Sequence, residues 1–183
     1  MPDAMLRQRF EQLALVHLDA AYNLARRLTH NAQDAEDLVQ EAYLRAFEAF
    51  ARFQGAHGKG WILTIVRNTF YTWHRLRTLH ADDETFEESL HTAAMAGHGE
   101  GPGRILGTPE RAALLQADID LVNRCLDALP VLLREVLVLR EFEGLSYQDI
   151  AAIVGVPKGT VMSRLSRARQ QLQCLLAQHL HKT

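Results

Sequence analysis

The sequence predicts an all-helical protein built from two small domains. Its apolar residues recur at intervals of three and four rather than two, which is typical of amphipathic helices and not of strands. This pattern stops between residues 81 and 107, where acidic residues and glycines replace the apolar ones. With 183 residues, 48% of them hydrophobic and 23% charged, the chain is long enough for one large or two small globular domains.

The first domain, residues 1–80, is expected to contain three helices. One apolar line from Leu6 to Leu28 predicts a single long helix. A second helix is predicted from about Ala35 to Phe50, and the glycine-rich segment 55–60 follows it. The third helix begins near Trp61, and the residues expected to face inward are Ile62, Ile65, Val66, Thr69, Trp73 and Leu76.

Residues 81–107 are predicted to be a flexible linker, because they are acidic, rich in glycine and contain Pro102. The linker separates the first domain from a second one, residues 108–183. Each domain lies near the lower size limit for an independent core. Helices of the second domain are expected at 109–128, 131–142, 146–153 and 158–178.

The charge of the chain is unevenly distributed, although its net value is only −2. Residues 51–80 and residues 158–183 each carry five lysines or arginines and no acid. Residues 32–50 carry five acids against one arginine, and residues 81–110 carry seven acids against one arginine. Because phosphate binding depends on the local field, the two basic segments predict two nucleic-acid contacts. One hypothesis is that the acidic linker covers these basic faces in the free protein.

Residues 144–170 have the local chemistry of a helix-turn-helix. Ser146 is a good N-cap with Asp149 at the capping-box position, Gly155 can end the short helix, and Pro157 can begin the next one. The second of these helices has an apolar line that is expected to pack inward: Val161, Leu165, Ala168 and Leu172. The opposite side offers hydroxyl, guanidinium and amide donors to a major groove: Thr160, Ser163, Arg164, Arg167 and Gln171.

Two further faces in the first domain have the composition of binding surfaces. Acidic residues line the outer side of the second helix and have Leu44 and Phe47 beside them, a mixture that suits protein docking. The outer side of the third helix mixes cations with rings, as single-stranded nucleic acid requires. The segment GAHGKG lacks the ending of a P-loop, which excludes a nucleotide site there. The residues of the third-helix face are Arg67, Asn68, Tyr71, His74 and Arg75, with Lys59 in the preceding loop.

Three motifs in this order resemble the bacterial sigma factors of the extracytoplasmic-function (ECF) group. They are DAEDLVQEAYLRAF at 34–47, GWILTIVRNTFYTWHR at 60–75 and the long segment from Leu129 to Arg169. The resemblance covers roughly residues 10–80 and 109–175. Many members of the group carry an acid where this chain has Thr72, so the sequence departs from the pattern in that turn.

The resemblance implies an alternative sigma factor that binds core RNA polymerase and directs promoter-specific transcription initiation. It also implies an anti-sigma partner and a signal sensed outside this chain. The residues implied for polymerase binding are Asp34, Asp37, Gln40, Glu41, Leu44 and Arg45. Those implied for the minus-ten element are Phe53, Lys59, Trp61, Arg67, Asn68, Tyr71, His74 and Arg75. Those implied for the minus-thirty-five element are Lys158, Thr160, Ser163, Arg164 and Arg167.

Two other classes of function are alternatives to this one. A stand-alone helix-turn-helix regulator with a helical sensing domain would bind a palindrome as a dimer, without polymerase. A helical metalloenzyme would have to use His17, His30, Glu36 and Glu41, but none of these four stands in an ExxH or HExxH pair. We therefore expect no catalytic residues, no metal and no cofactor.

The cysteines and the hydropathy set the expected location. Cys125 and Cys174 are far apart and form no CxxC pair, which argues against a disulfide framework or a zinc site. No apolar run is long enough to span a membrane, and the amino terminus is polar. We expect a cytoplasmic protein that does not insert into a membrane.

Overall fold

The computed structural model describes residues 2–55, 57–80 and 109–180, and within these ranges the chain is helical and contains no strand. This confirms the predicted all-α class. The predicted linker, residues 81–107, lies outside the described residues, so the hypothesis that it covers the basic faces stays a hypothesis. The first half contains α1 (Pro2–Leu13), α2 (Leu18–Thr29), α3 (Ala32–Phe50) and α4 (Gly58–His80). The second half contains α5 (Pro109–Asp127), α6 (Val131–Leu137), α7 (Tyr147–Val154) and α8 (Lys158–Leu180).

The first half packs α2, α3 and α4 against one another through their apolar faces. The Asn31 side chain caps α3 by accepting from the backbone N–H groups of Gln33 and Asp34, as an N-cap residue should. The helix α3 then buries the side predicted from its period and leaves the acidic side outward. Its buried residues are Ala35, Leu38, Val39, Ala42, Ala46 and Phe50.

The prediction of a single long helix from Leu6 to Leu28 is wrong, because the helix is interrupted between α1 and α2. A short 3₁₀ turn, Leu15–His17, separates the two helices. The hydroxyl of Tyr43 on α3 donates to the Ala14 carbonyl at 3.0 Å, and the α4 backbone at Gly58 presses against the Leu13 carbonyl. These contacts come from distant segments, so the apolar period alone could not predict the break.

The second half departs from the expected helices in one place. The segment expected at 131–142 is helical throughout, but its last part, Val138–Phe142, is a π-helical turn. Its end is marked by a bond from the Glu143 N–H to the Val138 carbonyl, with nitrogen and oxygen 3.2 Å apart. The buried line predicted for α8 is confirmed, since Val161, Leu165 and Ala168 are buried and Leu172 packs against the core.

The helix α4 is buried on more sides than its sequence predicts. Leu76, expected to face inward, is 48% exposed, whereas Leu63 and Phe70 lie in the core. The reason is that α4 packs against α2 and α3 on one side and against α7 of the second half on another. A helix covered by two neighbouring layers needs a wider apolar surface than a single stripe.

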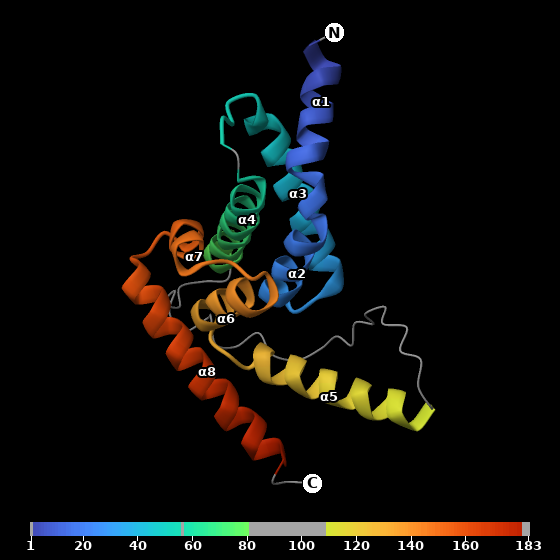
Figure 1. The fold of residues 1–183 in the computed structure, drawn as a ribbon, viewed down its shortest axis with the longest axis vertical. Helices are drawn as coiled ribbons and strands as arrows, with labels where there is room; N and C mark the ends of the chain where they lie inside the picture. The colour runs from blue at the N-terminus through green and yellow to red at the C-terminus, as the bar shows by residue number, and fades with distance from the viewer. Residues whose placement is uncertain (1, 56, 81–108, 181–183) are drawn as a thin grey trace.

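The two halves pack together. Buried residues of both belong to a single hydrophobic cluster. In Figure 1, α6 and α7 lie beside α2 and α4, and α5 and α8 extend away from this junction. The sequence predicts two domains joined by a linker but not this contact between them. We call it the interdomain junction.

Candidate functional site

The outer face of α3 combines acidic, amide and apolar side chains. Asp37, Gln40 and Arg45 are exposed, and Leu44 is 62% exposed although it is a large apolar residue. Such a residue within an acidic stripe is typical of a surface that binds another protein. This face therefore has the chemistry predicted for it.

Two residues of the same acidic set are tied to α4 instead. Asp34 pairs with Arg77, with the carboxylate oxygen and guanidinium nitrogen 3.5 Å apart. Glu41 accepts from the indole N–H of Trp73 and pairs with Arg45 one turn along α3. Both acids are half-buried. The exposed residues that are not tied to Glu41 or α4 are Asp37, Gln40 and Leu44, and Asp37 accepts a bond from Gln33 one turn earlier on α3.

The segment between α3 and α4 is held by stacked rings. The rings of Phe53 and Trp61 stack with their centroids 4.3 Å apart, and Phe50 lies against both. Arg9 of α1 donates to the Phe53 carbonyl at 3.4 Å and lies over the Phe50 ring. Phe53 and Trp61, both predicted to contact DNA, are thus half-buried against each other in this structure.

The remaining residues of the α4 set divide into an exposed group and a covered group. Asn68 and Arg75 are exposed, whereas His74 is half-buried, and burial together with the charge of Arg77 lowers its pKa. Arg67 and Tyr71 point into the interdomain junction. Arg67 donates two bonds to the Glu135 carboxylate on α6, at 2.8 and 3.2 Å.

Glu135 is the centre of a polar cluster within the junction. Its side chain has no exposed surface, and the Tyr71 hydroxyl donates to it at 3.0 Å. Arg164 of α8 lies on the other side, 3.7 Å from the second carboxylate oxygen. Burial, followed by the charge of Glu135, raises the pKa of Tyr71 well above its ordinary value. The residues Arg67, Tyr71, Glu135 and Arg164 are called the Glu135 cluster below.

The helix-turn-helix forms as predicted. Ser146 and Asp149 make the reciprocal capping box at the start of α7, and Gly155 ends the helix in the left-handed region at φ 69°. On α8 the predicted readers Lys158, Ser163 and Arg167 are exposed. Thr160 is half-buried, and Arg164 belongs to the Glu135 cluster and not to the open face.

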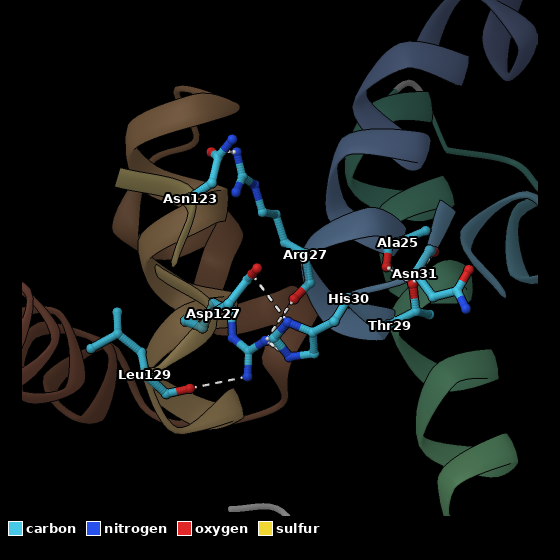
Figure 2. A network of polar contacts seen from close by, with 9 residues as sticks. Ala25, Arg27, Thr29, His30, Asn31, Asn123, Asp127 and Leu129 are labelled. Carbon is cyan, nitrogen blue, oxygen red and sulfur yellow. Dashed lines mark hydrogen bonds and ion pairs between the residues drawn. The ribbon is translucent and has the colours of Figure 1, made fainter. Parts of the chain in front are cut away.

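A second polar network joins α2 of the first half to α5 and α6 of the second (Figure 2). His30, at the end of α2 in a left-handed conformation, lies 3.0 Å from the Asp127 carboxylate of α5. Buried Arg134 of α6 donates to the Arg27 carbonyl of the first half at 2.9 Å and to the Leu129 carbonyl of the second at 3.0 Å. It also contacts the His30 ring. Arg27 itself donates to Asn123 at 2.8 Å.

The pKa values at this network follow from the surrounding charges. Burial alone would raise the pKa of Asp127, but the hydrogen bond and charge of His30, with Arg134 and Arg27 nearby, hold it below the ordinary value. Burial lowers the pKa of Arg134 to about 10, so this guanidinium keeps its charge at neutral pH.

Both halves of the chain match known sequence families. Residues 13–79 match the family described as Sigma-70 region 2, and residues 119–172 match Sigma-70, region 4. The RNA polymerase sigma-H factor of Pseudomonas aeruginosa is 35% identical over an alignment of 175 residues, which covers 91% of this chain and 85% of that protein. The ECF RNA polymerase sigma-E factor of Escherichia coli K12 is 35% identical over 76% of this chain and 72% of its own length.

The chain belongs to the ECF group of RNA polymerase sigma factors. It is an alternative sigma factor that directs transcription initiation, and the stand-alone regulator is not favoured. The ECF RNA polymerase sigma factor SigE of Mycolicibacterium smegmatis is 36% identical over 95% of this sigma factor. The match spans 64% of that relative's length.

Solved structures support the same fold for this sigma factor. The sigma factor RpoE, solved in complex with the anti-sigma factor NepR from Bartonella quintana, matches with a TM-score of 0.73 and 32% identity. That match covers 93% of this chain and 98% of the other. CnrH in complex with the cytosolic domain of CnrY matches with a TM-score of 0.61 at 24% identity, which shows likeness of fold alone.

The residues of this sigma factor that the sequence did not single out are those of the junction: Asp127, Arg134, Glu135 and Glu143. The available signal was the pair Arg134 and Glu135 inside the strongly apolar run from Leu129 to Leu139. Charged side chains in such a run must be paired when they are buried. The sequence gives no indication of which partners they take, because Arg67 and Arg27 lie more than sixty residues away.

Neither a metal-binding group nor a membrane-spanning helix occurs among the residues of this sigma factor that the structure describes. No group of three or more His, Cys, Asp or Glu residues there could hold a metal ion. His30 and Glu41, which a metal site would have needed, pair with Asp127 and Arg45. None of the described helices is both long enough and apolar enough to cross a membrane.

Proposed function

We propose that α3 binds core RNA polymerase, that the α3–α4 segment with α4 reads the minus-ten element, and that α8 reads the minus-thirty-five element. In this role the protein makes and breaks no covalent bond, so it is not an enzyme. It acts by holding two DNA-reading surfaces on the polymerase. Several weak contacts within one assembly gain from effective concentration, so neither half needs to bind DNA tightly alone.

The exposed face of α8 is the observation that carries this proposal. The preceding helix α7 is capped at both ends, and α8 presents Lys158, Ser163 and Arg167 to solvent. A rigid helix with hydroxyl and guanidinium donors on one side fits a major groove, where such groups bond to base edges and phosphates. For α3, the support is Leu44, which is exposed among acidic and amide side chains.

An anti-sigma factor is proposed as a further partner. The structural relative RpoE was solved with the anti-sigma factor NepR, and its match to this chain runs across both halves. A partner of bacterial core polymerase acts in the cytoplasm, which is the location that we propose.

The first experiment tests polymerase binding with a charge reversal on α3. Asp37→Arg is expected to reduce binding to core polymerase by about tenfold or more, because a like charge at an interface costs over 1 kcal/mol. Glu11→Arg, which makes the same charge change at an exposed site on α1, is the matched control. Wild-type affinity of Asp37→Arg in a pull-down would remove α3 from the interface.

The second part of the experiment is run-off transcription with core polymerase from a minus-thirty-five-dependent promoter. Arg167→Ala is expected to lower output by about five- to a hundredfold, since one good base or phosphate contact contributes about 1–3 kcal/mol. Arg169→Ala is the control, because Arg169 pairs with Glu141 within the second half. Equal output from the Arg167 and Arg169 variants would contradict the role of α8.

A further inference from the structure

The cations proposed to contact DNA are unevenly exposed in this structure. Lys158 and Arg167 are open to solvent, but Lys59, Arg67 and Arg164 have side chains that are only 31%, 16% and 21% exposed. These three come from both proposed DNA-reading surfaces, and each lies against a carboxylate of the second half.

Two glutamates supply these carboxylates. Glu135 accepts two bonds from Arg67 and lies 3.7 Å from Arg164, so one fully buried carboxylate faces an arginine from α4 and another from α8. The Lys59 ammonium pairs with the Glu143 carboxylate and donates to the Glu143 backbone carbonyl, both at 2.9 Å. Asn23 of α2 also donates to the Glu143 side chain, at 3.4 Å.

We propose that the packed molecule is a self-inhibited form in which Glu135 and Glu143 take the positions that DNA phosphates occupy on Lys59, Arg67 and Arg164. A carboxylate and a phosphate oxygen are both anionic acceptors that bind a guanidinium through the same fork of N–H donors. Arg67 and Lys59 cannot bond to these glutamates and to phosphates at the same time, and the Glu135 carboxylate stands 3.7 Å from Arg164. DNA must therefore displace these glutamates, and the two halves must separate before α4 and α8 read a promoter together.

This inference rests on the proposed function, because it assigns DNA-binding roles to Lys59, Arg67 and Arg164. It differs from the linker hypothesis, since the covering acids belong to the folded second half. The glutamates themselves are not proposed to touch DNA, so they can be changed without removing a DNA-reading residue.

The test compares Glu135→Gln with Glu141→Gln in the full chain. Both remove one negative charge, but Glu141 pairs with Arg169 inside the second half and leaves the junction intact. Glu135→Gln is expected to increase the radius of gyration in small-angle X-ray scattering, whereas Glu141→Gln keeps the wild-type value. The neutral amide has nearly the same size, so the change removes charge without opening a cavity.

The same variants are then titrated with labelled duplex and single-stranded DNA of mixed sequence. Glu135→Gln should bind more tightly than Glu141→Gln by roughly an order of magnitude at low salt. The slope of log affinity against log salt should steepen by roughly 1.4 to 1.8, because two freed arginines add about 0.7 each on single strands and 0.9 each on duplex. Equal affinities and equal slopes for the two variants would overturn the inference.

Two further measurements keep the result unambiguous. If circular dichroism shows that Glu135→Gln does not fold, Glu143→Gln decides, with the same expected direction and the same control. Run-off transcription with core polymerase separates the two proposals: a wild-type chain without activity there would sink the proposed function. An active wild type whose Glu135 and Glu143 variants bind DNA no better than Glu141→Gln would sink only the inference.

Discussion

At the scale of single residues, Glu135 depends on its neighbours for charge compensation, because its side chain is fully buried. Its carboxylate lies among Arg67, Tyr71 and Arg164, which belong to two separate helices of two different halves. A buried carboxylate left without its cations is costly, so each of these groups holds the others in place. The neighbouring residue Arg134 plays a similar part toward α2, since it bonds to carbonyl groups of both halves.

A pH dependence follows from Asp127. Its pKa is lower in the folded protein than in the unfolded chain, so its contribution to stability is complete above the unfolded value of about 4 and is lost as pH falls through the folded value. Asp127→Asn should therefore flatten the fall in melting temperature below about pH 5.

Asp118→Asn is the control for this prediction, because Asp118 is exposed on the same helix. Thermal melts between neutral and acidic pH give the comparison. Parallel acid profiles for the wild type and Asp127→Asn would show that the pair of His30 and Asp127 does not stabilise the fold.

At the scale of elements, local chemistry made some features predictable and long-range contacts hid others. The α7–α8 unit was predictable because Ser146, Asp149 and Gly155 act within a few residues of their own positions. The break between α1 and α2 was not, since it depends on Tyr43 and on the α4 backbone. The same holds for α4, where Leu63 and Phe70 are covered because a second layer packs on the helix.

A substitution at Gly58 tests the cause of the interruption between α1 and α2. A Cβ at Gly58 would overlap the Leu13 carbonyl oxygen, and a backbone atom cannot move aside as a side chain can. Gly58→Ala should lower the free energy of unfolding by about 1–3 kcal/mol, the usual cost of overpacking. Gly60 lies on the same helix, and a Cβ added there would have no neighbouring atom within 4 Å.

The two alanine variants should therefore move in opposite directions. Gly60→Ala is expected to gain about 0.5–1 kcal/mol from its helix propensity. Urea denaturation measures both. A neutral or stabilising effect of Gly58→Ala would mean that α1 and α4 separate easily at this point.

At the scale of the whole molecule, local patterns predicted several of the parts but not their assembly. The helical class, the helix-turn-helix and the outward acidic side of α3 all follow from period and capping. The predicted set of DNA-contacting residues requires every basic face to be open. The junction changes this for Arg67, Tyr71 and Arg164, and no local pattern pairs residues so far apart in the chain.

Arg134 provides a test of this assembly. Because the two halves share one core cluster, the wild type should unfold in a single calorimetric transition. Arg134→Met removes charged donors from the carbonyls of Arg27 and Leu129, and should cost about 2–3 kcal/mol. The melting temperature should fall by roughly 5 to 10 °C, and the transition should split as the halves unfold separately.

Arg140→Met is the control for Arg134→Met. Arg140 also donates to a carbonyl, that of Leu145 at 2.7 Å, but this bond lies within the second half. Its variant should keep a single transition. A single transition in Arg134→Met as well would show that the halves stay joined without this arginine.

The position of Glu135 between an arginine of α4 and an arginine of α8 has a thermodynamic consequence. Arg67 and Tyr71 of α4 lie on Glu135 beside Arg164, so separation of the halves uncovers the arginines of α4 and α8 at once. A ligand that engages α4 therefore makes α8 more available, and the reverse holds by an equal factor. Recognition of the two promoter elements would then be positively cooperative even though the elements never touch. A mismatch in one element would reduce occupancy of the other by that same factor.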